Sequence, residues 1–267
     1  MAGINNPSFD AACIFEKHTG LKRSHLPLCG GTDAEMPPDF WQDISRRAAG
    51  EPLQYIIGEW EFMGLSFKVG PGVLIPRPET ELLVEAAIAF LQGSQTRRML
   101  ELCAGSGCAS IASAKAVERL EAYCLEYSYD AIGYLEENIR LNEVQNSVHV
   151  IRGDMLDFES NHDLPQGLDL IICNPPYIKS GDITGLQREV KDHEPKLALD
   201  GGNDGLQFYH AFAPWVQLLQ KGGMAAFEIG EGQAAEVAEI LSAAGMTDIF
   251  IKNDYSGIER VVGGYNR

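Results

Sequence analysis

Long apolar runs are absent from this 267-residue sequence, since no stretch approaches the ~20 apolar residues that a membrane-spanning helix needs. The N-terminal stretch from Met1 to Lys17 also lacks the basic flank, apolar core and small-residue cleavage site of a secretory signal. These absences argue against a membrane span and against a secretion signal. We therefore expect a cytoplasmic protein with no membrane partner.

Basic residues are few, with 21 Lys and Arg against 38 Asp and Glu and a formal net charge of −17. Affinity for nucleic acid depends largely on neutralising phosphates, and no run of Lys or Arg supplies a basic face. We therefore expect no direct nucleic-acid binding. An acidic chain suits a protein or small-molecule partner better.

Paired cysteines are also absent. The six cysteines form no C-x-x-C unit, so neither a zinc ribbon nor a thioredoxin-like redox site is predicted. Cys103, Cys124 and Cys173 lie at the ends of apolar runs, where cysteine behaves as a small buried hydrophobe. We expect free thiols and no metal site.

What is present is the composition of an ordinary globular protein, with 45% hydrophobic and 22% charged residues. A chain of this length can form one main domain and a small accessory domain. Helical periodicity over Phe9–His18 and Phe40–Ala49, interrupted by prolines and glycines from Pro27 to Pro38, predicts a helical N-terminal domain over residues 1–52.

Aromatic and β-branched residues follow from Leu53 to Val69, with glycines at the breaks, and this pattern favours a hairpin. We expect residues 53–72 to link the two domains. A helix is predicted over Glu81–Leu91, with Thr80 or an upstream acidic residue as its cap.

Short apolar strands then alternate with helices. Strands are predicted at Met99–Cys103, Ala122–Glu126, Val148–Ile151, Leu168–Cys173, Ala225–Ile229, Asp248–Lys252 and Glu259–Gly263. Helices are predicted from Gly107 onward and over Tyr129–Leu141, Leu206–Leu219 and Gln233–Ala244. This alternation predicts an α/β fold for residues 73–267, with a seven-stranded and mainly parallel sheet. The last two strands have no helix between them, so at least one is expected to run antiparallel.

A glycine loop follows the first of these strands. Cys103, Ala104, Gly105, Ser106 and Gly107 lead directly into a helix, which places glycines where the backbone must approach a ligand at a helix N-terminus. A tight turn without a ligand would give the same pattern. A dinucleotide site is a further alternative, although its third glycine would stand at Ser110.

An acidic residue ends the next strand. Glu126 lies nineteen positions after Gly107, where a carboxylate can accept hydrogen bonds from both ribose hydroxyls of NAD or of S-adenosylmethionine. Asp154 and Met155 follow the third strand, where an adenine ring would lie. Asp154 could accept from the exocyclic amine, and the Met155 thioether could pack on the ring.

The tetrapeptide Asn174-Pro175-Pro176-Tyr177 follows the fourth strand and decides between the two cofactors. Two prolines fix the backbone and remove two N–H groups, so the Pro175 carbonyl can point outward without an internal partner. Together with the Asn174 side-chain oxygen it can accept both hydrogens of an NH2 group, while Tyr177 covers the planar group that carries it. We predict S-adenosylmethionine as the cofactor and these residues as the substrate site.

The chemistry of an amide explains these residue types. An amide nitrogen is a poor nucleophile because its lone pair is delocalised, and two hydrogen bonds to its hydrogens favour the pyramidal geometry of attack. Asn174 is neutral, and no strong base is needed before methyl transfer. Catalysis by Asn174, Pro175 and Tyr177 is therefore expected to rest on orientation.

The sequence resembles the HemK/PrmC family, the peptide-chain-release-factor glutamine N5-methyltransferases. The resemblance is carried by blocks in one order at residues 49–58, 73–81, 174–178, 194–195, 199–206, 227–230 with Gln233, and 259–262. It implies a Rossmann-like class I methyltransferase sheet and a substrate-recognition role for the helical domain over 1–52. Arg77 and Glu79 to Glu81 fall in one block, either near the cofactor or as a charged helix N-terminus.

The resemblance also implies a substrate and a product. The cofactor would be bound by Cys103 to Gly107, Glu126, Met155 and Asn174, and would leave as S-adenosylhomocysteine. The glutamine would be held by Asn174 to Tyr177, and would come from the Gly-Gly-Gln loop of bacterial class I release factors. Cys103, Ala104, Glu126 and Met155 differ from the residues common in the family but keep similar size or chemistry. We expect a monomer.

Two alternatives share much of this pattern. An adenine- or guanine-methyltransferase acting on nucleic acid would use the same pocket, but it needs a basic face that the charge of −17 disfavours. A binding module without turnover would keep the fold, and the intact Asn174 loop disfavours it.

Overall fold

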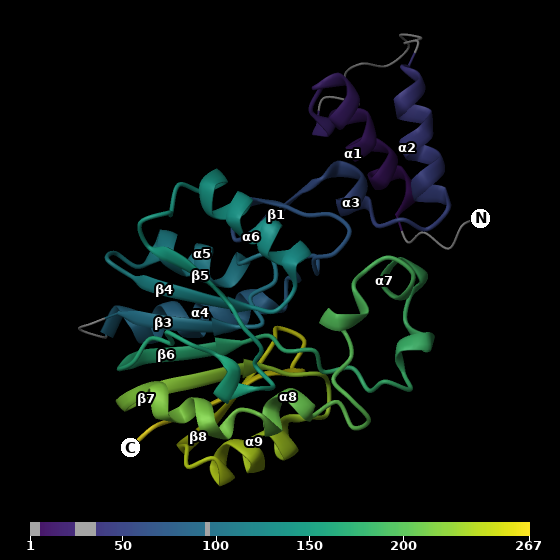
Figure 1. The fold of residues 1–267 in the computed structure, drawn as a ribbon. Helices are drawn as coiled ribbons and strands as arrows, with labels where there is room; N and C mark the ends of the chain where they lie inside the picture. The colour runs from purple at the N-terminus through teal and green to yellow at the C-terminus, as the bar shows by residue number, and fades with distance from the viewer. Residues whose placement is uncertain (1–5, 25–35, 94–96) are drawn as a thin grey trace.

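A computed structural model describes residues 6–24, 36–93 and 97–267. Figure 1 shows two parts, a small helical domain near the N-terminus and a larger domain built on a sheet. Most of the predicted break between Pro27 and Pro38 lies outside the described residues.

The helical domain consists of α1 (Pro7–Thr19), α2 (Pro38–Ala48) and α3 (Leu53–Ile57). The Asn6 side chain caps α1 by accepting from the Phe9 N–H, and α1 ends at Gly20 in the left-handed region. Apolar side chains from all three helices form one small core, made of Cys13, Ile14, Phe40, Leu53 and Ile56. The predicted helices are thus confirmed over the described residues.

The predicted hairpin was wrong in its first part. Residues Leu53–Ile57 form α3, and the hairpin itself is β1 (Glu59–Phe62) and β2 (Leu65–Lys68). Leu53 and Ile56, three positions apart, both enter the core of the helical domain, which only a helical spacing allows. Gly58, at φ 83°, ends the helix.

The larger domain contains a seven-stranded sheet with the order β5-β4-β3-β6-β7-β9-β8. Its strands are β3 (Arg98–Leu102), β4 (Glu121–Glu126), β5 (Val148–Arg152), β6 (Leu168–Cys173), β7 (Leu219–Glu228), β8 (Thr247–Asn253) and β9 (Glu259–Tyr265). Pairs from β5 to β7 are parallel, and β9 is antiparallel to both of its neighbours. The predicted fold class is confirmed.

Helices cover both faces of the sheet (Figure 1). The first face carries α4 (Thr80–Gly93), α5 (Cys108–Ala116) and α6 (Tyr129–Leu141). The second face carries α8 (Gln207–His210), the 3-10 helix Ala213–Leu218 and α9 (Ala234–Ala243). Along β3, Met99 packs into the first layer and Leu100 into the second, as the two-residue period of a strand requires.

The single helix predicted over Leu206–Leu219 was wrong. The chain forms α8, then a 3-10 helix that contains Pro214, and β7 begins at Leu219 rather than at Ala225. Proline has no N–H to continue an α-helical ladder, which accounts for the change of helix type. The segment between β6 and α8 holds only short turns of helix: α7 (Arg188–Lys191) and the 3-10 turns Ile183–Gly185 and Lys196–Ala198, while Phe158–Ser160 follows β5.

The order of the strands sets the place of a ligand site. β3 pairs with β4 on one side and with β6 on the other, and the chain crosses from β5 at the edge of the sheet back to β6, so the strand order reverses between β3 and β6. Ligands bind at such a switch point, outside the carboxyl ends of the strands. No helix in the described residues is long and apolar enough to cross a membrane.

Candidate active site

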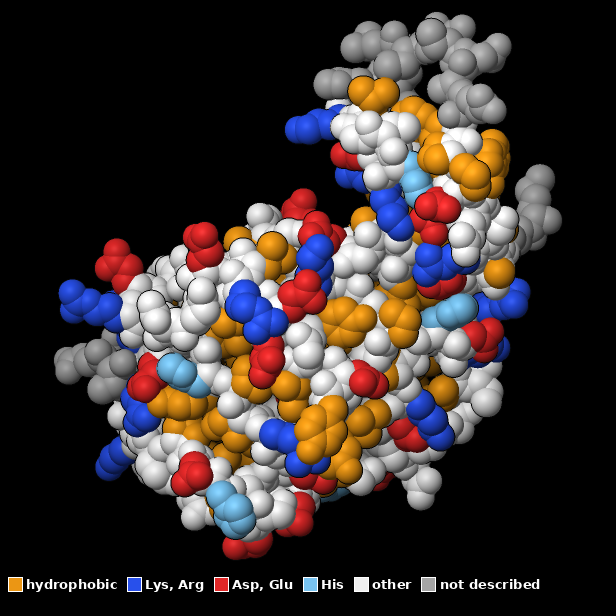
Figure 2. Space-filling model, turned by 45° about the horizontal axis from the view of Figure 1, so that its top comes forward, with side chains coloured by type: hydrophobic (Ala, Val, Ile, Leu, Met, Phe, Trp, Pro, Cys, Tyr) orange, Lys and Arg blue, Asp and Glu red, His pale blue; other side chains and the backbone are white. Residues whose placement is uncertain are grey.

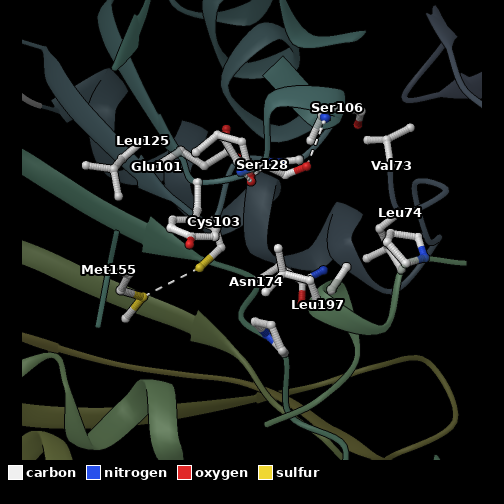
Figure 3. Close-up of a pocket in the computed structure, with 18 of the residues that line it drawn as sticks. Val73, Leu74, Glu101, Cys103, Ser106, Leu125, Ser128, Met155, Asn174 and Leu197 are labelled. Atoms are coloured by element: carbon white, nitrogen blue, oxygen red, sulfur yellow. Dashed lines mark hydrogen bonds between the residues drawn. The ribbon is translucent and has the colours of Figure 1, made fainter. Parts of the chain in front are cut away.

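A cavity of about 300 Å³ lies beyond the carboxyl ends of β3 to β6. Figure 3 shows Cys103 and Met155 on one side of it and Val73 and Leu74 on the opposite side. The structure brings together most of the predicted site residues as its lining: Cys103, Ala104, Gly105, Ser106, Glu126, Asp154, Met155, Asn174 and Pro176. Three further predicted residues, Gly107, Pro175 and Tyr177, are not part of that lining.

Glu126 holds the glycine loop in place. Its Oε2 accepts from the Gly105 N–H at 2.8 Å, and its Oε1 accepts from the Ser128 N–H at 2.8 Å. Glu126 is only 8% exposed. A carboxylate oxygen has two lone pairs, so each oxygen can accept one further hydrogen bond from a ligand in the cavity.

Gly107 serves packing rather than the cavity. It caps α5 with φ 75°, and a Cβ at this position would lie 2.2 Å from Leu135 Cδ1. Only glycine fits between the loop and α6 without moving that leucine. Cys103 adopts a left-handed conformation with φ 56° where β3 meets the loop.

Three sulfur atoms lie together at one side of the cavity. Cys103 Sγ and Cys173 Sγ each lie 3.7 Å from Met155 Sδ. The Met155 carbonyl accepts a hydrogen bond from Trp215 Nε1 at 3.1 Å, which helps to hold Met155 in place. Asp154 lies beside it, and its Oδ1 accepts from the Leu156 N–H. This side of the cavity therefore combines apolar contact area with one carboxylate.

The segment between Gly72 and Arg77 lines the opposite side. The Tyr55 hydroxyl donates to the Val73 carbonyl at 2.6 Å, and the Ile75 N–H donates to Glu194 Oε2 at 3.3 Å. Arg77 forms an ion pair with Glu194, whose side chain is only 1% exposed. Burial raises the pKa of Glu194, and Arg77 opposes that rise.

These contacts decide between the two interpretations of Arg77. It lines the cavity and is tied to a loop 117 positions later in the chain. Glu79 is exposed, and Glu81 accepts from the Met63 N–H in the β1–β2 hairpin. Arg77 therefore belongs to the wall of the site, whereas Glu79 and Glu81 lie outside it.

Glu101 is a lining residue that the sequence analysis missed. It is 5% exposed, and its Oε2 accepts from the Ser110 N–H at 2.9 Å. Burial raises its pKa to about 7. The signal was a carboxylate inside an apolar strand directly before the glycine loop, a position at which a buried charge needs a reason.

The Asn174 loop presents two oxygen atoms as possible hydrogen-bond acceptors. Asn174 Nδ2 donates to Thr80 Oγ1 at 3.1 Å. Within residues 6–24, 36–93 and 97–267, neither Asn174 Oδ1 nor the Pro175 carbonyl accepts a hydrogen bond. Thr80 is the first residue of α4 and contacts this loop.

The backbone of Tyr177 packs closely against two glycines. A Cβ on Gly201 would lie 2.8 Å from Tyr177 Cα, and one on Gly205 would lie 2.5 Å from its carbonyl oxygen. Gln233 Nε2 donates to the Tyr177 carbonyl at 3.1 Å, while its Oε1 accepts from the Gly230 N–H. Two glycines and one glutamine thus hold the loop against the segments that follow β6 and β7.

Comparisons with known proteins agree with this geometry. Residues 1–58 match a family model described as PrmC N-terminal domain, and residues 78–201 match one described as methyltransferase small domain. A release factor glutamine methyltransferase of Geobacter sulfurreducens is 42% identical over 267 residues, covering 98% of this chain and 90% of the relative. The chain belongs to this family. A relative of the same name from Clostridium acetobutylicum is 37% identical over 91% of this chain and 86% of its own.

Solved structures of methyltransferases share the fold of this family member. One from Pyrococcus furiosus aligns with a TM-score of 0.56 at 16% identity, over 76% of this chain and 90% of that chain. Ribosomal protein L11 methylase of Lactobacillus delbrueckii aligns with a TM-score of 0.52 at 15% identity, over 75% and 86%. The predicted family is confirmed by the relatives, and its class I methyltransferase fold by these structures.

Proposed function

We propose that the protein transfers a methyl group from S-adenosylmethionine to the side-chain amide nitrogen of the glutamine in the Gly-Gly-Gln motif of release factors. The observation that carries the proposal is the pair of acceptors at Asn174 Oδ1 and the Pro175 carbonyl, which have no hydrogen-bond donor among the described residues. A pair of acceptors matches the two hydrogens of a primary amide.

The cavity fits this cofactor. Its volume lies at the lower end of the ~300–1,000 Å³ typical of small-molecule sites. Glu126 would accept from the ribose hydroxyls, and Asp154 from the adenine amine, while Met155 would pack on the ring. Glu101 is a buried carboxyl whose ionised form a cationic ligand would stabilise. When bound, the cofactor supplies an electrophilic methyl group on a positively charged sulfur.

The residues of this chain act by orientation. Asn174 Oδ1 and the Pro175 carbonyl would accept both amide hydrogens, and the Tyr177 ring would contact the amide plane. The nitrogen lone pair is then free to face the methyl group. Alignment of this kind is worth several kcal/mol without any charged base.

The N-terminal helical domain, residues 1–52, would recognise the release factor, with residues 53–72 as the link to the catalytic domain over 73–267. Ion pairs from Arg47 to Asp10 and to Glu189 connect the helices to the loop that follows β6. We further propose that the protein acts as a monomer and in the cytoplasm, where its substrate works.

Methylation of a nucleic-acid base is the alternative. Figure 2 shows Lys and Arg side chains interspersed with Asp and Glu on the described part of one face, around hydrophobic side chains near its centre. This mixed face, with the net charge of −17, favours a protein substrate over a polyanion.

Labelled S-adenosylmethionine tests the proposal. We expect label on a class I release factor, and none on the same factor with Ala in place of the glutamine of its Gly-Gly-Gln motif, or on DNA or RNA. Equal labelling of both release factors would overturn the assigned acceptor, and labelling of nucleic acid alone would support the alternative.

A further inference from the structure

Two buried polar side chains lie next to the Asn174 loop, and one of them, Thr80, also lines the cavity. Thr80, the first residue of α4, is 3% exposed, and Glu228, the last residue of β7, is 1% exposed. Glu228 is not part of the cavity lining. A polar pair that is buried here needs a reason, because an apolar pair of similar shape would avoid the cost of desolvation.

The first contact joins Thr80 to the catalytic loop. Asn174 Nδ2 donates to Thr80 Oγ1 at 3.1 Å. A threonine hydroxyl has one proton to donate and lone pairs with which to accept. While the hydroxyl accepts from Asn174, its own proton must point elsewhere.

The second contact provides an acceptor for that proton, the Glu228 carboxyl. Glu228 lies close enough to Thr80 for a hydrogen bond from the Thr80 hydroxyl to lower the pKa of the Glu228 carboxyl. Among the described residues, Glu228 Oε2 has no hydrogen-bond partner, so this carboxyl has unused acceptor capacity. Burial raises the pKa of Glu228 to about 7, and the hydrogen bond from Thr80 opposes that rise. In its ionised form, which predominates above pH 7, this carboxylate can only accept, so it receives the hydroxyl proton of Thr80 in a hydrogen bond.

The direction of this chain decides which end of the Asn174 amide faces the cavity. With its proton given to Glu228, Thr80 can only accept, and only the NH2 end of Asn174 can donate to it. The Oδ1 end is then turned away from Thr80. The reversed amide would present an NH2 group to the NH2 group of the substrate, with no acceptor between them.

We propose that Glu228 and Thr80 are positioning residues that set the orientation of the Asn174 amide, so that its Oδ1 is the acceptor for the substrate amide. The inference rests on the proposed function of Asn174. Neither residue touches the reacting atoms, and both act through Asn174.

Three single variants test this relay, by which we mean the hydrogen-bond chain from Glu228 through Thr80 to Asn174. In Thr80→Val the hydroxyl is lost, and in Glu228→Gln the new NH2 group can donate to Thr80, which turns the hydroxyl proton toward Asn174. We expect each to lower kcat by about 10²-fold, the size associated with a misplaced reacting group, while the Kd for S-adenosylmethionine stays within about threefold. Thr80→Ser keeps the hydroxyl and should restore kcat to within about threefold of the wild type.

In the double variant Thr80→Val/Glu228→Gln, kcat should fall no further than in either single variant, because both substitutions disrupt the same chain of hydrogen bonds. Thr247→Val is the matched control, since the Thr247 hydroxyl donates to the Tyr265 carbonyl at the far edge of the sheet. Its kcat should equal that of the wild type. Glu228→Gln keeps the shape of the side chain and carries the test if Thr80→Val does not fold.

Two outcomes would overturn the relay: wild-type kcat in both Thr80→Val and Glu228→Gln, or a loss in Thr80→Ser as large as in Thr80→Val. A failure of the proposed function has a different signature, because the wild-type protein would then leave the release factor unlabelled. In that case the side-chain amide resonances of Asn174 still decide the relay, since they should shift in Glu228→Gln and not in Thr247→Val.

Discussion

The proposed cofactor side and the proposed substrate side of the cavity differ in the chemistry of their side chains. On the cofactor side, Glu101 and Glu126 present carboxylates that backbone N–H groups of Ser110, Gly105 and Ser128 hold in place. On the substrate side, Asn174 and Pro175 present neutral oxygens without partners among the described residues.

The difference fits what each side is proposed to bind. A cationic cofactor is attracted by negative charge, whereas the two hydrogens of an uncharged amide need only well-placed acceptors. A carboxylate on the substrate side would also attract the positively charged cofactor, and this attraction would compete with the carboxylates on the cofactor side. The comparison therefore predicts that substitutions on one side change the Kd of the cofactor, and that substitutions on the other side change kcat.

Asn174→Ala should give the largest effect and sharpen the comparison. It removes one prearranged acceptor, and a loss of this kind typically lowers the rate by about 10² to 10³-fold. Calorimetry should find the cofactor Kd within a few-fold of the wild type, and Asn253→Ala, an exposed asparagine of β8, should leave both quantities unchanged. A retained kcat in Asn174→Ala would refute its catalytic role.

Glu126→Ala tests the cofactor side. The ribose hydroxyls lose a charged acceptor worth about 1.5–3 kcal/mol, which corresponds to a Kd about 10- to 150-fold weaker. Glu121→Ala, at the other end of β4, is the control and should bind the cofactor normally. If the cofactor Kd in Glu126→Ala stays at the wild-type value, Glu126 does not hold the ribose.

Arg77→Ala should lower stability through Glu194. Breaking a fully buried ion pair costs about 3–5 kcal/mol, and Arg77 is 30% exposed, so we expect a loss of about 2 kcal/mol at pH 7. Arg98→Ala is the matched control, because Arg98 is equally exposed but pairs with the exposed Glu121. Its loss should stay below about 1 kcal/mol.

The pH dependence of that loss has a definite sign. The pKa of Glu194 is raised in the folded protein, so its ionised form destabilises the fold above the unfolded pKa of ~4.3. Arg77 offsets part of this cost. The deficit of Arg77→Ala in urea unfolding should therefore shrink as the pH falls toward 4, where Glu194 is protonated, and a deficit independent of pH would contradict this account.

Glu101 predicts a smaller, pH-dependent effect on the cofactor side. Its pKa of about 7 means that the carboxyl is largely protonated at pH 6, and a cationic cofactor favours the ionised form. Cofactor affinity should rise by up to about tenfold from pH 6 to pH 8 and level off above. In Glu101→Gln the affinity should be weaker and flat over this range. A rising profile in that variant would assign the titration to another group.

Tyr177→Phe should have the smallest effect. The ring that is proposed to contact the amide plane remains, and only the hydroxyl is lost, so kcat should fall by no more than about threefold. Tyr177→Ala removes the ring and should cost considerably more. If both variants behave alike in release-factor methylation assays, the ring plays no part in holding the amide.

Several parts of the site could be predicted from local sequence. The glycine loop at 103–107, the acidic end of β4 and the Asn174 loop each combine residue types whose chemistry is evident without neighbours. The strands were predicted because apolar runs of four to six residues with turn signals have few other solutions. The segment at 53–57 was mistaken for strand because a short apolar run fits either period.

The sequence by itself determined the succession of most strands and helices along the chain, the acidic charge and the residues of the two proposed ligand loops. These features depend on composition and on neighbours in the chain. The tertiary structure alone decided the partners of Asn174 and Arg77, which lie 94 and 117 positions away. It also placed Glu101 in the cavity and Glu228 behind it. The physical reason is that burial and hydrogen-bond direction depend on which strands become neighbours in the sheet. The order of the strands within the sheet is not encoded in any one local pattern.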